Sequence, residues 1–308
     1  MFGFLFKKQA DAPTNAAQER AQRTLEAFEQ GTLPRDVVDR LEKTRQGNLP
    51  WTSDLSVNEW LALRPFQLEP IGQVMGSSVF HVGFVASQWG LGSMPTNHEL
   101  IAPTQAAYEG KRLAMLRLEK EAKQLGANAV VGVRISQKKW SEEDRVIEYV
   151  SYGTAVHVEG LPENDRPMLA SVSGQDFVRL LQANAVPIGV ALGTSYYYVV
   201  TGWRAMRQER SFYNQEMDTF QEAVSTVRHL VIKRMKEEAV RLGGTGVISA
   251  DFTLQVHDVP REVGENESVT DHIIDVSMLG SVLSTTSFQP SPAVSMTVNL
   301  RDYSSREL

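Results

Sequence analysis

The sequence predicts an α+β fold in which two similar units follow one another along the chain. The stretch LGANAVVGVRI, which begins at Leu125, returns 117 residues later as LGGTGVISADF, which begins at Leu242. Each stretch follows a long segment with an apolar stripe at helical spacing and precedes a last strand that contains a glycine. This order of elements is typical of a helix packed on a mainly antiparallel sheet.

Two short helices are expected before the first unit. The stretch NAAQERAQRTLEAFEQG is rich in helix-forming residues and ends at Gly31, which suits a helix C-terminus. The next stretch, LPRDVVDRLEKTRQGN, has Pro34 near its start and Gly47 near its end. Helices this short do not fold alone, so residues 1–50 are expected to form a helical N-terminal arm that needs a surface to lie on.

The two units begin with similar sequences. Ser56–Val133 aligns without a gap to Ser173–Ala250, at a constant offset of 117. SVNEWLAL and SGQDFVRL each place a serine three residues before an acid, which is the capping-box pattern of a helix start. PIGQVMGSS at Pro70 and PIGVALGTS at Pro187 then predict a strand with a second glycine four residues after the first.

A long helix and two more strands complete each unit. Gly126 and Gly243 end the helices, because a left-handed residue is needed there and glycine tolerates it. The β-branched run that follows predicts a buried strand. The last strands contain Gly153 and Gly280, which correspond at an offset of 127, so the second unit has ten more residues in its final hairpin. The apolar stripes are Met115, Leu118, Ala122 and Leu125, and Ile232, Met235, Ala239 and Leu242.

A polar linker separates the two units. LPENDRP, residues 161–167, has a proline near each end, which favours a domain boundary. The expected domains are therefore residues 51–160 and 168–288. The remaining residues, 289–308, are expected to form a C-terminal tail.

Composition excludes several classes of function. With 308 residues, 42% of them hydrophobic, the chain can bury a core of about two domains. A net charge of -6 argues against a broad nucleic-acid surface, which needs clustered lysine and arginine. The chain has no cysteine, so disulfides, thiolate ligands and cysteine nucleophiles are excluded, and a cytoplasmic location is expected. No apolar stretch approaches the 18 or so residues that span a bilayer.

The first eight residues, MFGFLFKK, have two interpretations. They are either a frayed terminus or a segment packed against another subunit, or they dip into a membrane interface or a partner groove while the lysines meet anionic head groups. The second interpretation makes the protein peripheral to a membrane. The residues concerned are Phe2, Phe4, Leu5, Phe6, Lys7 and Lys8.

The first unit resembles the YbjQ-like proteins, a family labelled heavy-metal-binding. The resemblance rests on PIGQVMGSSVF, AKQLGANAVVGVRI and YVSYGTAV, and the second unit looks like a diverged copy. It implies a dodecin-like β-α-β-β unit in each domain and assembly into rings, commonly of five. We therefore expect a homo-oligomer, with a pentameric ring favoured. The family label brings no ligand residues to this chain, and the absence of cysteine departs from any thiolate-based version of it.

No motif in the sequence indicates an enzyme. The chain matches no P-loop, dinucleotide-binding glycine fingerprint, nucleophile elbow or metalloprotease helix motif. Acidic residues are spread along the expected helices, where pairing with lysine and arginine four residues away explains them. Tyr196, Tyr197 and Tyr198 are read as core or ring-facing residues, with a cofactor-binding group as the alternative. No catalytic residue and no organic cofactor is therefore expected.

A possible metal site lies in the long hairpin HDVPREVGENESVTDH. If the hairpin folds about residues 264–265, Asp258 faces Asp271 across two strands, and imidazole and carboxylate groups converge on a divalent cation such as Zn²⁺, Ni²⁺ or Mn²⁺. The alternative is a solvated acidic hairpin. The four candidate ligands are His257, Asp258, Asp271 and His272.

Two functions follow from the sequence. The first is a non-enzymatic, ring-forming assembly or scaffold protein, because fusion of two copies lets one keep the ring contacts while the other specialises. The second is a module that binds a metal or a small ligand, with its site in the second-domain hairpin or between subunits.

Overall fold

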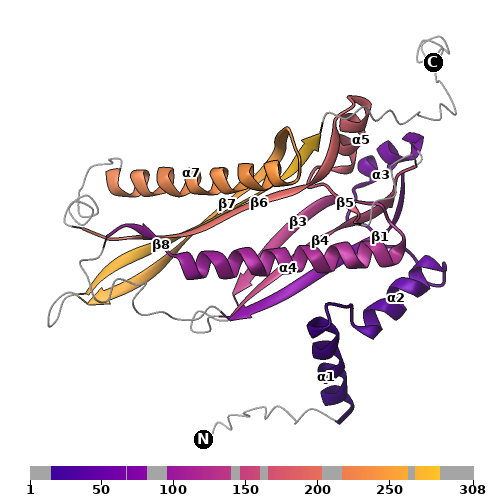
Figure 1. Ribbon diagram of the computed structural model, residues 1–308, viewed down its shortest axis with the longest axis horizontal. Helices are drawn as coiled ribbons and strands as arrows, with labels where there is room; N and C mark the ends of the chain where they lie inside the picture. Colours follow the sequence, from indigo (N-terminus) through magenta and orange to yellow (C-terminus); the bar gives the residue numbers. More distant parts are fainter. Residues whose placement is uncertain are drawn as a thin grey trace, which may run out of the picture.

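The computed structural model describes residues 15–66, 68–81, 96–139, 146–159, 166–202, 217–262 and 268–284. These residues form two four-stranded sheets with helices packed on them, so the predicted α+β class is confirmed. Two long helices, α4 (Ile101–Leu125) and α7 (Asp218–Arg241), lie on opposite sides of the second sheet (Figure 1).

The first sheet has the strand order β1-β4-β3-β5. β4 is antiparallel to both β1 and β3, and the short β5 runs parallel to β3. The sheet is therefore mixed. Its strands are β1 (Glu69–His81), β3 (Ala129–Lys139), β4 (Val146–His157) and β5 (Met168–Leu169).

The second sheet has the order β2-β6-β8-β7 and is antiparallel throughout. Strands β6-β8-β7 repeat the order β1-β4-β3, and the bulges in β3 and β7 occur at the same place in the pairing. We call two residues counterparts when they hold the same place in the two similar units, whether in a strand, a helix or a connecting segment. The strands are β2 (His98–Glu99), β6 (Val186–Val199), β7 (Gly246–Glu262) and β8 (Ser268–Ser284).

The two sheets exchange a short strand each. β2 precedes α4 in the chain, yet it pairs with β6 of the second sheet. β5 follows the polar linker, yet it extends the first sheet beside β3. The two halves of the chain are thus joined by backbone hydrogen bonds as well as by side-chain packing.

The short helices begin where the sequence predicts. At the start of α3 (Val57–Leu63), the Ser56 hydroxyl accepts from the backbone N–H of Glu59, and the Glu59 carboxylate accepts from the N–H of Ser56. α5 (Gly174–Gln182) starts with the equivalent bond from the N–H of Asp176 to the Ser173 hydroxyl. A short 3-10 helix, Arg64–Phe66, follows α3.

The second glycine of each Pro-Ile-Gly strand allows the long helix to approach the sheet. A Cβ atom on Gly76 of β1 would overlap the carbonyl oxygen of Ala114 in α4. A Cβ atom on Gly193 of β6 would overlap the carbonyl oxygen of Val231 in α7. Each helix therefore packs directly on strand backbone, a contact that only glycine permits.

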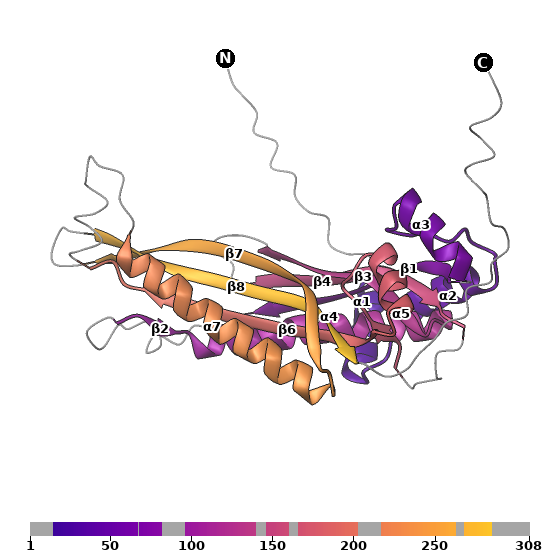
Figure 2. The same ribbon diagram turned by 90° about the horizontal axis from the view of Figure 1, so that it is seen from above.

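The predicted N-terminal arm consists of α1 (Asn15–Glu29) and α2 (Arg35–Arg45). α2 packs on α4 of the same chain, and α1 meets α4 near its C-terminal end, where Arg117 lies over the ring of Phe28. Leu41 is buried in the core that α4 covers, and Arg40 donates to Glu121 at 3.0 Å. Lys120 donates to the carbonyl oxygen of Gly31. Figure 2 shows α3 and α5 gathered at the same end of the molecule as α2.

The free edge of β1 is capped by two side chains of α4. The N–H of Met75 donates to the Glu121 carboxylate at 3.0 Å, and Arg117 donates to the carbonyl oxygen of Ser77. Burial raises the pKa of Glu121, while the bonds from Met75 and Arg40 act in the opposite direction. An exposed strand edge invites pairing with another strand, and this capping prevents it.

α7 caps the edge of β6 with the counterpart residues. The N–H of Leu192 donates to Glu238 at 2.6 Å, and Arg234 donates to the carbonyl oxygen of Thr194 at 2.9 Å. The interpretation of the helix acids as surface partners of neighbouring lysine and arginine is therefore wrong for Glu121 and Glu238. Both carboxylates bind strand backbone.

We expect Gly76→Ala to destabilise the fold by about 1–3 kcal/mol, because the new methyl group must push α4 away from β1. Urea unfolding followed by circular dichroism measures this loss. Gly246→Ala is the matched control, since a Cβ atom on this strand glycine meets nothing within 4 Å. Equal stability of the two variants would contradict the role of Gly76.

Candidate functional site

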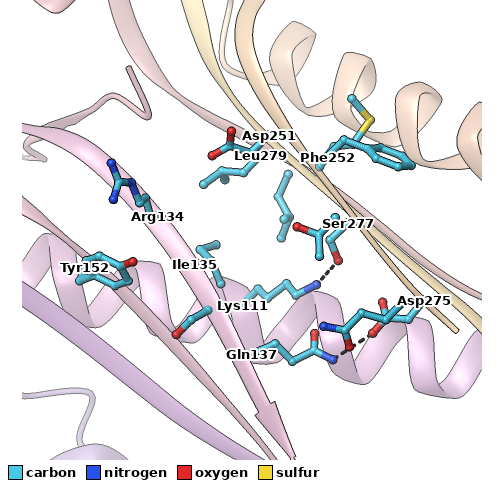
Figure 3. Close-up of a pocket in the computed structure, with 15 residues that line it drawn as sticks. Lys111, Arg134, Ile135, Gln137, Tyr152, Asp251, Phe252, Asp275, Ser277 and Leu279 are labelled. Atoms are coloured by element: carbon cyan, nitrogen blue, oxygen red, sulfur yellow. Dashed lines mark hydrogen bonds between the residues drawn. The ribbon is translucent and has the colours of Figure 1, made fainter. Parts of the chain in front are cut away.

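A cavity of about 460 Å³ lies between the two sheets, beside α4 (Figure 3). Side chains from β3 and β4 line it on one side, and side chains from β6, β7 and β8 line it on the other. The charged residues in its lining are Lys111, Arg134, Asp251 and Asp275. The cavity is therefore a space of mixed polar and apolar lining within the contact between the two sheets.

Lys111 of α4 extends into this contact with only 3% of its surface exposed. Its ammonium group donates to the Thr194 hydroxyl at 3.2 Å and to the Ser277 hydroxyl, both on the second sheet. It also lies 5.6 Å from the ring centre of Tyr149. Burial opposes the charged form and lowers the pKa of Lys111 to about 8, although the negative charge of Asp275 acts to raise it.

Asp275 supplies the opposite charge from the second sheet. It is buried, and its carboxylate accepts from the Gln137 side-chain amide of β3 at 2.9 Å. The same amide donates to the Tyr196 hydroxyl at 3.0 Å. Burial and the charge of Asp275 raise the pKa of Tyr196 well above its usual value, so this tyrosine stays neutral.

These groups form a polar network across the contact between the sheets. Lys111 of α4 and Gln137 of β3 belong to the first layer, and their partners belong to the second sheet, so the hydrogen bonds are satisfied in one relative position of the two layers. The Lys111 ammonium already has hydroxyl partners and a neighbouring carboxylate. The arrangement is suited to fixing the two sheets against each other.

Further polar contacts tie the same two layers together. The Tyr108 hydroxyl of α4 donates to Glu238 of α7 and lies against the carbonyl oxygen of Leu192, both at 2.8 Å. Further along the same edge of β6, Arg234 binds both oxygens of Glu99 and so holds β2. Desolvation acts to raise the pKa of Glu99, but the bond from Arg234 and the weaker bonds prevail and lower it.

The hairpin residues predicted to bind a metal are divided between the two faces of the second sheet. The strands pair with Asp258 opposite His272, whereas the sequence interpretation placed Asp258 opposite Asp271, and that register is wrong by one residue. The imidazole of His272 lies 3.0 Å from the Asp258 carboxylate. Because side chains alternate along a strand, a shift of one residue moves Asp271 to the other face.

On that other face, Asp271 is fully buried and already bonded. It accepts from Arg261, from the Tyr198 hydroxyl and from the backbone N–H of Thr201. Burial lowers the pKa of His257, which favours its neutral form. Among the described residues, no group of three or more histidine, aspartate or glutamate side chains is arranged to hold a metal ion.

The remaining candidates are placed as follows. Tyr196 and Tyr198 are buried in the contact between the sheets, and Tyr197 lies on the α7 side, as the core interpretation predicts. The apolar and basic residues at positions 2 to 8 lie outside the described residues.

Sequence reasoning missed the edge-capping pair on each long helix. A signal was present, because RLEKE at Arg117 and RMKEE at Arg234 occupy the same place in the repeat and both preserve arginine and glutamate four residues apart. The network around Lys111 had no such signal, since its second-unit counterpart is Arg228 on an exposed helix face.

Fold and site together define an α+β protein built from two layers of helix on sheet, held by a buried polar contact. Residues 71–159 match the YbjQ-like family, which is described as "Putative heavy-metal-binding". The chain is also 31% identical over 251 residues to an encapsulin nanocompartment protein of Mycobacterium tuberculosis, a match that covers 76% of this chain and 94% of that protein. The chain belongs to the protein family of this mycobacterial nanocompartment protein, and its first unit is a YbjQ-like domain.

Shorter relatives match a part of the chain. A UPF0145 protein of Bacillus velezensis is 38% identical over 66 residues, which is 21% of this chain and 57% of that protein. A UPF0145 protein of Acinetobacter baylyi is 43% identical over 61 residues, 20% of this chain and 55% of that protein. None of these relatives is named as an enzyme. No solved structure matches the chain significantly.

In the part of the chain that the structure describes, no helix is long and apolar enough to cross a membrane. Even the two long helices carry charged residues along their length.

We expect Lys111 to make stability depend on pH. In the unfolded chain lysine keeps its proton up to about pH 10.4, whereas folded Lys111 releases it from about pH 8. The unfolded state therefore binds more protons between these values, and folding stability rises with pH. From pH 8 to 9.5, the free energy of unfolding should rise by on the order of 1 kcal/mol relative to Lys111→Met.

Urea unfolding of both proteins at pH 7, 8 and 9.5 measures this difference. Groups other than Lys111 titrate in both proteins and cancel in the comparison. Parallel pH profiles would mean that burial does not lower the pKa of Lys111.

Proposed function

We propose that this protein is a non-enzymatic, self-assembling component of a protein nanocompartment. The observation that carries the proposal is the similarity to the mycobacterial nanocompartment protein. The match spans 94% of that protein and 76% of this chain, which is more than one predicted domain contains. The relatives that match only about a fifth of the chain do not carry this name.

In this proposal the chain has an arm, residues 1–50, two copies of one domain, residues 51–160 and 168–288, and a tail, residues 289–308. The matching order of the three main strands in each sheet supports the duplication. The protein acts as a cytoplasmic homo-oligomer, with a pentameric ring favoured. Large apolar side chains that are exposed on the single chain support association with further copies.

The first measurement is native mass spectrometry of the full-length protein purified without chelators. We expect a closed oligomer whose mass is a whole multiple of the chain mass, with five copies favoured. The same spectrum reports any bound mass. A monomer at micromolar concentration would overturn the proposal.

The second candidate function is a metal site, and the pair of Asp258 and His272 is the observation that favours it. Zinc is usually bound by four ligands, so this pair needs further ligands from another subunit. Bound metal would appear in the spectrum as excess mass in proportion to subunit number. Its loss in His272→Ala, but not in the His229→Ala control on α7, would support this candidate.

We also propose that the segment before α1 contacts a membrane surface or a partner protein. Deletion of all of residues 1–50 is unsuitable as a test, because it removes Leu41 from the core. Deletion of residues 1–14 leaves α1 and α2 in place. We expect this variant to keep the oligomer mass and to lose cosedimentation with vesicles that contain anionic phosphatidylglycerol.

Phosphatidylcholine vesicles are the control for that experiment, since they carry no net charge for the two lysines to meet. Unchanged sedimentation with anionic vesicles would rule out the membrane contact, and the purified nanocompartment would then be the next partner to test.

A further inference from the structure

The contact between the two sheets joins unlike faces. We call the face that carries the long helix the helix face of a sheet, and the opposite one its bare face. Lys111 on the helix face of the first sheet meets Thr194 and Ser277 on the bare face of the second. Gln137 meets Asp275 in the same way. The contact therefore uses one helix face and one bare face. Among the described residues, no second sheet covers the other helix face or the other bare face.

The unused bare face, on the first sheet, exposes large apolar residues. Met75 and Val79 of β1 are 52% and 50% exposed. Their counterparts in β6, Leu192 and Tyr196, are 1% and 6% exposed because they lie in the internal contact. The same structural positions are thus buried where a partner is present and exposed where none is.

The unused helix face, on the second sheet, has an apolar strip beside α7. Phe252, Leu254 and Val256 of β7 are spaced two residues apart on one side of the strand, and all three are exposed. Their counterparts begin with Ile135 of β3, which is partly buried against the core and lines the internal cavity. The strip on β7 therefore holds the same place in the second unit as the surface of β3 that takes part in the internal contact holds in the first.

The backbone shows the same difference, because the edge of β3 has a partner segment and the edge of its counterpart β7 has none among the described residues. The segment 168–172, which leads into α5, pairs with the edge of β3, where Ala170 donates to Val130 and Gly132 donates to Val172, both at 2.9 Å. β7, the counterpart of β3, ends the second sheet, and in the described part of the chain no strand lies beyond it. The counterpart of segment 168–172 is segment 51–55, which leads into α3.

Segments 51–55 and 168–172 also make equivalent hydrogen bonds, the first to the first sheet and the second to the second sheet. The N–H of Asp54 donates to the Thr154 hydroxyl at 3.1 Å, and the N–H of Ser171 donates to the Ser281 hydroxyl at 2.8 Å. Thr154 and Ser281 are counterparts in β4 and β8. Segment 51–55 is thus held on the bare face of its sheet in the position from which segment 168–172 reaches β3.

We propose that a second copy of this chain docks the bare face of its first sheet on the helix face of α7 and β7, and that its segment 51–55 extends the sheet beside β7. This surface rests on the proposed self-assembly and specifies how it occurs. The contact joins two different surfaces, so each added copy presents the same free faces, and the chain of contacts closes into a ring or continues as a filament.

The counterparts of the internal charged pair identify a pair between copies. Arg228 of α7 is the counterpart of Lys111, and Glu148 of β4 is the counterpart of Asp275. Arg228 is exposed, with its guanidinium 5.4 Å from the ring centre of Phe252. In the proposed contact, Arg228 of one copy lies close to Glu148 of the next.

A charge exchange tests this contact. Arg228→Glu and Glu148→Arg should each raise the concentration at which the oligomer dissociates by at least about tenfold, because each places like charges together. The two changes in one chain should restore assembly. Arg23→Glu on exposed α1 is the matched control and should leave dissociation unchanged. Mass photometry over a dilution series measures the wild type and all four variants.

Met75→Asp provides a second reading, since it places a charge in the apolar part of the same contact. Circular dichroism and thermal melting check that every variant folds. An oligomeric wild type whose dissociation is unchanged in Arg228→Glu, Glu148→Arg and Met75→Asp would overturn this contact and leave the proposed function intact. A monomeric wild type would overturn both.

Discussion

The burial of α4 between two sheets is the contact on which the rest of the structure depends. One side of this helix lies directly on Gly76 of the first sheet, and the other side meets the second sheet through Tyr108 and Lys111. A helix covered on two sides needs small or apolar residues around most of its circumference, and Ala107 and Ala114 meet that need. α7 has one covered side only, and its opposite side carries charged residues. The two helices are otherwise similar, and the difference in their surface residues follows from the number of sheets that cover each one.

The polar network inside the contact fixes the relative position of the two sheets more than it stabilises the fold. Desolvating Lys111 and Asp275 costs free energy that their attraction only partly offsets, and an apolar pair of equal volume would often stabilise as well. Apolar packing alone, however, would tolerate a shift of one sheet along the other. Gln137 binds Asp275 and Tyr196 with one amide group, so a shift would leave buried polar atoms without partners. The network thus makes one arrangement of the two sheets much better than its neighbours.

Much of the fold could be predicted because it is encoded by local signals. The serine caps, the glycines at helix ends and the paired strand glycines each act through their immediate neighbours, and the repeat shows every signal twice. The exchanged strands β2 and β5 could not be predicted, since two residues carry no periodic pattern. The register of the long hairpin was wrong for a different reason: register depends on the turn, and a shift of one residue moves Asp271 to the opposite face.

The contact between the sheets joins a helix face to a bare face, and this determines what the surface of a single chain exposes. When two similar units pack with unlike faces together, one face of each kind is left over in the part of the chain that the structure describes. The exposed residues on these faces are not the polar ones that a free surface favours: Met75 and Val79 on one side, Phe252 and Val256 on the other. Strand residues on a permanently exposed face could become polar without loss to the core, because their side chains point away from it. Their apolar character therefore indicates that these faces are covered when the protein works, and a surface shaped like the internal partner is what fits them.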